Sequence, residues 1–211
     1  MDNICHYISV GIDLTGSEKK HSGWAVLNDN VASTCPIRTD QELIDTTASQ
    51  NPTVVVLDAP LSLPAGRLSV FDTDPGRHQF GITRECERAL LRVGIRSYPC
   101  LIPSMQRLTE RGIRLAAEFR SMGFEVIEGY PGGAQDILGI PRKQKGILEL
   151  AKGIERFGIT GSFINKTVSH DELDAITAAI VGCFYLAGSY EAFGNEAEGL
   201  LIVPRLILPG I

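Results

Sequence analysis

Residues 7–28 read YISVGIDLTGSEKKHSGWAVLN, and this stretch decides the fold. A run of strand-forming residues, 7–12, ends on a carboxylate, Asp13, and a polar turn follows it. A second strand-like run covers residues 23–27. The pattern predicts a hairpin whose apolar first strand is central in a sheet. An ionised Asp13 at the end of a buried strand is costly unless it is paired, hydrogen-bonded or bound to a metal.

The strand and helix signals that follow predict an α/β fold. Residues 31–37 are expected to form a third strand, and Thr39 opens a capping box with Glu42 for a short helix. Residues 54–57 form a continuous apolar run, as expected for a strand covered on both faces, and the run ends on Asp58. We therefore expect a mixed sheet of three antiparallel strands followed by parallel strands, with helices on both faces.

The chain length of 211 residues fits one domain with an elaboration. We expect a single domain over residues 1–211 with a helical insertion at residues 60–122. Proline and glycine are frequent in residues 61–82, which predicts an irregular surface segment. Two helices are expected after that segment, at residues 83–94 and 104–123.

The last third of the chain is expected to complete the sheet and cover it. A strand is predicted at residues 124–130, and an apolar stripe predicts a helix at residues 145–157. A Ser-His-Asp-Glu capping box opens the last helix, residues 170–187, whose broad apolar face predicts burial. Residues 199–204 are expected to form an edge strand.

The composition is that of a globular protein. Hydrophobic residues make up 44% of the sequence, which is enough for a core, and the net charge of -5 does not favour nucleic-acid binding by the whole surface. No apolar run approaches the roughly 20 residues of a membrane helix, and the start of the chain lacks the layout of a signal peptide. Five cysteines without a C-x-x-C pair indicate reduced thiols in a cytoplasmic protein.

Carboxylates are predicted to gather at one edge of the sheet. Asp13 and Asp58 end two strands that we expect to be parallel neighbours, so they should lie side by side. Asp171 and Asp174 share one face of the last helix and should reach the same edge. Four such carboxylates repel one another and raise each other's pKa values, which two divalent cations would relieve. Carboxylate and water oxygens suit Mg²⁺ or Mn²⁺.

Each of these acids also has a structural interpretation. A turn-initiating or capping role fits Asp13, and Asp171 at the second helical position complements the helix dipole. Asp174 lies a full turn inside an otherwise apolar helix, which is harder to explain without a partner. Glu128 precedes a Tyr-Pro pair at the edge expected to be active, so a catalytic role stands beside that of an exposed strand residue.

A basic segment follows the irregular one. Residues 84–120 contain eight arginines against four acids, and both phosphate contact and ordinary ion pairing on a helix surface fit this excess. We select Arg84 and Arg88 as candidates to hold a substrate phosphate. Lys145, which with Lys143 follows a Pro-Arg pair before a helix, is a third candidate.

Several motifs in this order resemble a known group of enzymes. A strand ending in GID, a strand ending in LDAP and a late HDELDAITAAI resemble RNase H-fold nucleases, and among them the RuvC-type Holliday-junction resolvases. With R-x-C-E-R and VIEGYP, the set is similar to a family of uncharacterised proteins predicted to be RNase H-fold nucleases. The resemblance covers most of residues 7–187 and implies the fold and a metal site. Where the resolvases have Glu on the fourth strand, this chain has Asp58, which is shorter by one methylene.

We therefore expect a Mg²⁺- or Mn²⁺-dependent nuclease that hydrolyses phosphodiester bonds in nucleic acid by the two-metal scheme. The four aspartates would be the metal ligands, and Glu128 would join them in catalysis. Two alternatives stay open. A nucleotide-binding phosphotransferase of the actin and sugar-kinase superfamily shares this sheet, but it needs a second domain and a glycine-rich loop where this chain has Ala-Pro after Asp58. A non-catalytic nucleic-acid-binding module would keep the fold. DNA or RNA as the substrate, and monomer or dimer, also stay open.

Overall fold

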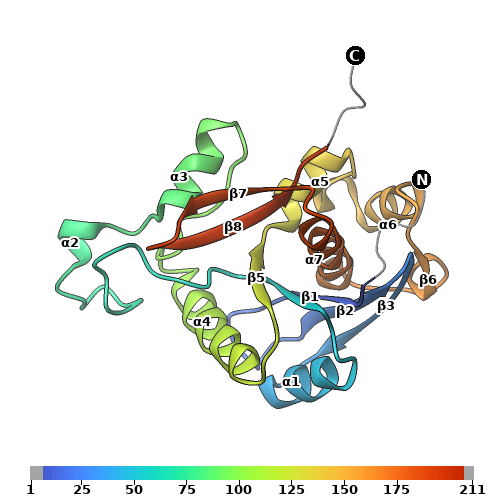
Figure 1. Ribbon diagram of the computed structural model, residues 1–211, viewed down its shortest axis with the longest axis horizontal. Helices are drawn as coiled ribbons and strands as arrows, with labels where there is room; N and C mark the ends of the chain where they lie inside the picture. Colours follow the sequence, from blue (N-terminus) through green and yellow to red (C-terminus); the bar gives the residue numbers. More distant parts are fainter. Residues whose placement is uncertain (1–6, 207–211) are drawn as a thin grey trace.

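The computed structural model describes residues 7–206, which form one mixed sheet with helices on both faces (Figure 1). The strands are β1 (Ser9–Asp13), β2 (Ser22–Asn28), β3 (Val31–Ile37), β4 (Val54–Asp58), β5 (Val126–Gly129), β6 (Thr160–Gly161), β7 (Tyr190–Asn195) and β8 (Gly199–Pro204). The α-helices are α1 (Asp40–Ser49), α2 (Arg77–Phe80), α3 (Glu85–Arg92), α4 (Gln106–Ser121), α5 (Pro131–Leu138), α6 (Ile147–Arg156) and α7 (His170–Leu186). Two 3-10 turns, η1 (Lys143–Lys145) and η2 (Ser162–Ile164), flank α6.

The sheet has the order β6-β3-β2-β1-β4-β5-β8-β7. Strands β1, β2 and β3 pair antiparallel, while β4 runs parallel to both β1 and β5. The predicted mixed sheet with a central first strand is therefore confirmed. The parallel register pairs Ser9 with Val54 and continues to Asp13 opposite Asp58, so both strands end at the same level.

Helix α7 lies directly against β1 because small residues face it. A side chain at Gly11 would bring its Cβ within 2.1 Å of the Ala175 carbonyl oxygen, so only glycine allows this approach. Ser9 Oγ donates to the Ala179 carbonyl at 2.8 Å, which fixes the helix along the strand. The predicted capping box opens the helix, with Ser169 and Glu172 each accepting from the other's backbone N–H. As a result, α7 begins beside the end of β1.

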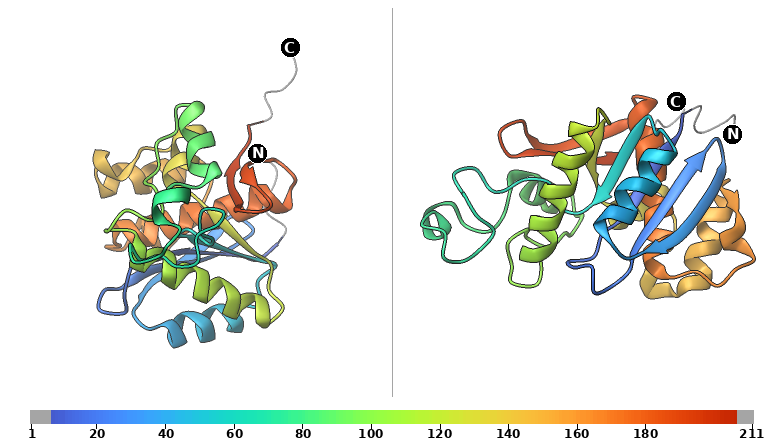
Figure 2. Two further views of the ribbon diagram at one scale, coloured as in Figure 1. Left: turned by 90° about the vertical axis from the view of Figure 1, so that its left-hand side faces the viewer. Right: turned by 90° about the horizontal axis from the view of Figure 1, so that it is seen from below.

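Helices α1 and α4 cover the opposite face of the sheet (Figure 2). Leu115 and Phe119 of α4 pack in one buried cluster with Val10 and Ile12 of β1. Helix α4, the last helix of the insertion predicted at residues 60–122, therefore packs in the layered core. Helix α3 packs on β7, with Cys86 and Leu90 in one buried cluster with Phe193, whereas α2 has no buried residue.

Helix α2 lies in the segment predicted to be irregular, and three further elements were not predicted, for local reasons. Helix α5 starts with Pro-Gly-Gly, which resembles a chain break, although proline fits the first helical position well. Strand β7 carries glycine and glutamate, so it lacks a clear strand pattern. Strand β6 has only two residues. Residues 199–204 do form a strand, but β8 pairs with β5 on one side and β7 on the other, so the expectation of an edge position is wrong.

The structure also bears on the expected redox state of the cysteines and on the expected absence of a membrane helix. Cys35, Cys86 and Cys100 are free thiols, whereas Cys183 takes part in a disulfide. The expectation of reduced thiols is therefore wrong for Cys183, and Cys5 lies outside the described residues. Within residues 7–206, every helix is too short or too polar to cross a bilayer.

Candidate functional site

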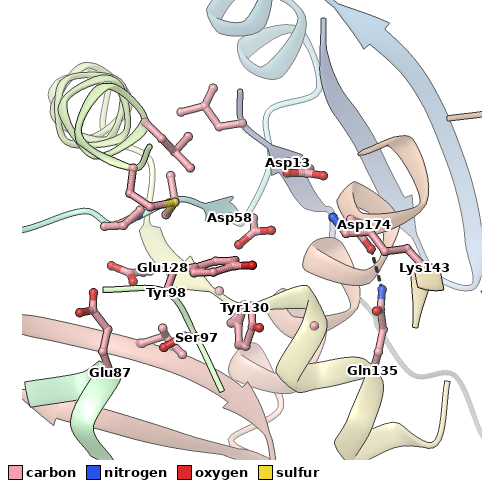
Figure 3. Close-up of a pocket in the computed structure, with 18 of the residues that line it drawn as sticks. Asp13, Asp58, Glu87, Ser97, Tyr98, Glu128, Tyr130, Gln135, Lys143 and Asp174 are labelled. Atoms are coloured by element: carbon pink, nitrogen blue, oxygen red, sulfur yellow. Dashed lines mark hydrogen bonds and ion pairs between the residues drawn. The ribbon is translucent and has the colours of Figure 1, made fainter. Parts of the chain in front are cut away.

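A cavity of about 340 Å³ opens at the carboxyl ends of β1, β4 and β5 (Figure 3). Its wall includes Asp13, Asp58 and Glu128, one from each of these strands, and Asp174 from α7. Ligands of open α/β sheets bind outside the carboxyl ends of the strands. The position and the acidic lining together mark this cavity as the candidate functional site.

Asp13 and Asp58 form the centre of the site. They are register partners on adjacent parallel strands, which lie about 4.8 Å apart in β-sheets. Burial is the largest cause that raises the pKa of Asp13 well above its usual range, followed by repulsion from the Asp58 carboxylate. Burial and repulsion from Asp174 raise the pKa of Asp58 to about 8. The predicted juxtaposition of two strand-end carboxylates is therefore present.

Asp174 is buried on the other side of the cavity, with its carboxylate held by two partners. Gln135 of α5 donates to Oδ1 at 2.7 Å, and the Lys143 ammonium contacts Oδ2 at 3.2 Å. Burial alone would lower the pKa of Lys143, but the carboxylates of Asp174 and Asp13 outweigh it and raise that pKa. A lysine therefore supplies positive charge within the cluster formed by Asp13, Asp58 and Asp174.

Asp171 lies one helical turn before Asp174 and is not among the described residues that line the cavity. Its charge nevertheless contributes to raising the pKa values of both Asp13 and Asp58, as a smaller cause than burial. The structure thus brings three of the four predicted aspartates to the cavity and leaves Asp171 at its periphery.

Glu128 and Arg84 form a buried ion pair in the cavity wall. Arg84 is 1% exposed, and its two terminal nitrogens donate to the two Glu128 oxygens at 2.7 and 2.6 Å. Arg84 also donates to Glu87 Oε1 and to Ser62 Oγ, each at 3.0 Å. Glu128 accepts a further bond from the Leu61 backbone N–H. Glu128 was predicted to take part in catalysis and Arg84 to hold a substrate phosphate, yet in this structure the polar groups of both side chains are bound by protein partners.

The R-x-C-E-R motif contains a signal for this network. Glu87, three residues after Arg84, accepts from the Arg84 backbone N–H at 3.0 Å, as in a capping box. The spacing therefore indicates a helix start that places an arginine and a glutamate together. Nothing in the local sequence points to Glu128, which is 44 residues away.

The other two residues predicted to hold a substrate phosphate, Arg88 and Lys145, lie away from the cluster of Asp13, Asp58 and Asp174. Arg88 is partly exposed on α3 and pairs with Glu85 and Glu198. Lys145 is exposed in η1, two residues after the Lys143 that contacts Asp174. Of the eight arginines in residues 84–120, Arg84 is the one that lines the cavity. The basic side chains at the cavity come mainly from the chain before α6, where Arg142 joins Lys143.

Sequence reasoning missed several residues that line the cavity, among them Gln135, Tyr98, Tyr130 and Arg142. The Tyr98 side chain is 74% exposed although it lines the cavity, and the Arg142 guanidinium lies 5.7 Å from the centre of the Tyr130 ring. An amide or an aromatic residue has no distinctive spacing in a sequence. These residues are recognised only after the fold gathers them.

The donor chemistry of the cavity fits a hard divalent cation, because five carboxylates line it and three of them, Asp13, Asp58 and Asp174, are not paired with Arg84. The distances among these side chains are less favourable for a metal ion. Within residues 7–206, no group of three or more His, Cys, Asp and Glu side chains has the spacing to hold a metal ion. Asp174 directs one oxygen to Lys143 and the other to Gln135, so release of Lys143 would free one oxygen to join Asp13 and Asp58 as a ligand.

The fold and the site together define an α/β protein with an acidic cavity at the carboxyl edge of a mixed sheet. No family model and no curated protein matches the chain. The function is therefore inferred from the geometry of the cavity itself.

Proposed function

We propose that this chain is a metal-dependent nuclease of the RNase H-like fold, hydrolysing phosphodiester bonds at the acidic cavity. The observation that carries the proposal is the pairing of Asp13 with Asp58 at the ends of two central parallel strands, with Asp174 across the cavity. Buried carboxylates this close destabilise a fold unless a positive charge compensates them. A cation-binding role accounts for their position better than a structural role does.

The proposed ligands are Asp13, Asp58 and Asp174. Bound Mg²⁺ or Mn²⁺ would supply charge neutralisation and a water of lowered pKa. Gln135 keeps Asp174 oriented through its 2.7 Å hydrogen bond. Lys143, once released from Asp174, is positioned to contact a phosphate oxygen.

The remaining predicted residues receive supporting roles in the proposal. The Glu128 carboxylate is neutralised by Arg84, so we assign this pair the task of holding the cavity wall. Asp171 adds negative charge from the periphery. Arg88 and Lys145 are exposed, which suits contact with a polyanion approaching the cavity. No specific observation favours the phosphotransferase alternative.

The direct test is a cleavage assay with single-stranded, duplex and branched DNA and single-stranded RNA in Mg²⁺ and Mn²⁺. We expect cleavage by the wild type and loss of at least about 100-fold in Asp13→Asn, Asp58→Asn and Asp174→Asn. Asp45→Asn, an exposed acid on α1, is the matched control and should retain activity. Equal rates in the cavity variants and the control would overturn the proposal. Metal-independent binding without cleavage would support the binding-module alternative.

A further inference from the structure

The most exposed aromatic side chain that lines the cavity is Tyr98. It is 74% exposed, on the segment that joins α3 to α4, and its ring lies at the same cavity as Asp58 and Glu128 (Figure 3). Packing does not explain this side chain, because most of its surface faces solvent. An aromatic ring displayed at the rim of a cavity is suited to stack on a flat ligand.

The backbone on both sides of Tyr98 is anchored. Tyr130 Oη donates to the Arg96 carbonyl at 2.7 Å, and the Cys100 backbone N–H donates to Glu87 Oε1 at 3.1 Å. Glu87 is itself held by the buried Arg84. The ring is therefore presented from a fixed segment, and fixing a contact before binding reduces the entropy lost on binding.

The neighbouring Ser97 hydroxyl is an independent sign of a ligand. Ser97 lines the same cavity, and its Oγ is buried with no hydrogen-bond partner among residues 7–206. A buried polar atom without a partner is costly and requires an explanation. Rotation of the Ser97 side chain toward the cavity would let a ligand seated beside Tyr98 supply the missing partner.

The cavity combines three kinds of surface that a nucleotide unit requires. Tyr98 offers an aromatic face, and Lys143, which contacts Asp174, adds positive charge to the same cavity. The carboxylates of Asp13, Asp58 and Asp174 line this cavity as well. The volume of about 340 Å³ is near the lower end of the roughly 300–1,000 Å³ of small-ligand sites, which suits one nucleotide rather than a long ligand.

We propose that Tyr98 is a stacking platform for one unpaired nucleobase, so that the site takes a nucleotide unit from a single strand or as a free nucleotide. The inference rests on the proposed nuclease function, and it restricts the substrate of that function to unpaired nucleotides. The base lies on the Tyr98 ring, and its phosphate points toward the side of Lys143 and the carboxylates. A paired base inside a duplex cannot present its face in this way.

The test measures binding to a short single strand that carries 2-aminopurine, with Ca²⁺ in place of Mg²⁺ to prevent cleavage. The wild type should quench the 2-aminopurine fluorescence as the base stacks on the ring. Tyr98→Ala should abolish this quenching and weaken binding by about 5- to 100-fold, the range for loss of one base–aromatic contact. Tyr98→Phe keeps the ring and should bind within about twofold of wild type.

Phe71→Ala is the matched control, because Phe71 is a partly exposed aromatic residue that does not line the cavity. It should bind like the wild type. A strand with an abasic site in place of 2-aminopurine should bind weakly and equally to the wild type and Tyr98→Ala. A free nucleotide tested in parallel distinguishes the two sources of the base. If the free nucleotide binds as tightly as the strand, and this affinity depends on Tyr98, the substrate is a nucleotide. If the free nucleotide binds much more weakly than the strand, the substrate is a single strand.

Unchanged affinity and quenching in Tyr98→Ala would overturn the stacking platform, as would Tyr98-independent binding of a duplex as tightly as the single strand. Neither result bears on cleavage, which the aspartate variants test separately. Conversely, Tyr98-dependent stacking in a protein that cleaves nothing would retain the platform and refute the nuclease proposal.

Discussion

Replacing Arg84 with methionine is expected to destabilise the cavity wall. Arg84 is 1% exposed, and its guanidinium donates to Glu87, Ser62 and both oxygens of Glu128. Methionine replaces the aliphatic stem of the arginine and carries no charge. In Arg84→Met, Glu87 and Glu128 would therefore stay buried without a cation between them.

The magnitude follows from what each carboxylate retains. Removing one partner of a buried ion pair costs about 3–5 kcal/mol. Two carboxylates lose their partner here, but Glu128 keeps the Leu61 N–H at 2.8 Å, and Glu87 keeps the Cys100 N–H at 3.1 Å. These bonds hold the expected loss within that range. Since 1 kcal/mol shifts the melting temperature of a domain of this size by about 2–4 °C, the expected fall is about 6–20 °C.

Urea unfolding followed by circular dichroism, with thermal melts in parallel, would measure this loss. Arg88→Met is the matched control: Arg88 is 44% exposed on the same helix, and its surface ion pairs should contribute at most about 1 kcal/mol. Combining Arg84→Met with Glu128→Gln should cost less than the sum of the two single changes, by about 0.5–3 kcal/mol, because the double variant leaves one buried charge fewer.

A loss below about 1 kcal/mol in Arg84→Met, accompanied by weaker nucleic-acid binding, would refute this reasoning. The guanidinium would then serve substrate phosphate, as the sequence alone suggested, and the ion pair with Glu128 would contribute little to the fold. An additive double variant would refute the coupling between the two side chains in the same way.

Three further outcomes are expected. In metal-free protein, the free energy of unfolding should fall as pH rises from about 4 to about 8, because burial and Asp174 raise the pKa of Asp58 in the folded protein to about 8, above its unfolded value. In urea unfolding, Asp58→Asn should flatten this pH dependence. A flat profile in the wild type would contradict the prediction. Gly11→Ala should prevent folding to soluble protein, since its Cβ would meet the Ala175 carbonyl at 2.1 Å, whereas Gly16→Ala, with its nearest atom at 3.5 Å, should express normally. Asp74→Asn should increase proteolysis of residues 66–81, because Asp74 accepts from Arg67 and three backbone N–H groups there; an unchanged digestion pattern would show that the loop does not depend on this carboxylate.

Much of the fold could be predicted from the sequence because its signals are local. The hairpin after residue 9, the apolar strand that ends at Asp58 and the capping box at Ser169 each depend on residues within a few positions. The pairing of Asp13 with Asp58 then needs only one further step, since parallel neighbours end at the same level. That step is why the centre of the site was predictable.

The side-chain partners of the site could not be predicted, because they come from distant segments. Arg84 and Glu128 are 44 residues apart, and Gln135 reaches Asp174 across 39. The excess of arginines in residues 84–120 was misleading for the same reason, because some of their partners are distant in the sequence. Arg111 is bound to Asp40, 71 residues away, so a count of local charges overstates the basic surface that remains for a ligand.

The lysine at the cavity explains how such an acidic site is compatible with a stable fold. Lys143 contacts Asp174 and faces Asp13, so its ammonium offsets part of the repulsion among the carboxylates. Its side chain is 51% exposed while that of Asp174 is 6% exposed. The ammonium can therefore leave with little loss of packing, whereas Gln135 stays buried and keeps Asp174 in place. The same lysine that compensates the carboxylates is thus free to turn toward a phosphate. In the proposed nuclease, one side chain would then both stabilise the site and bind the substrate.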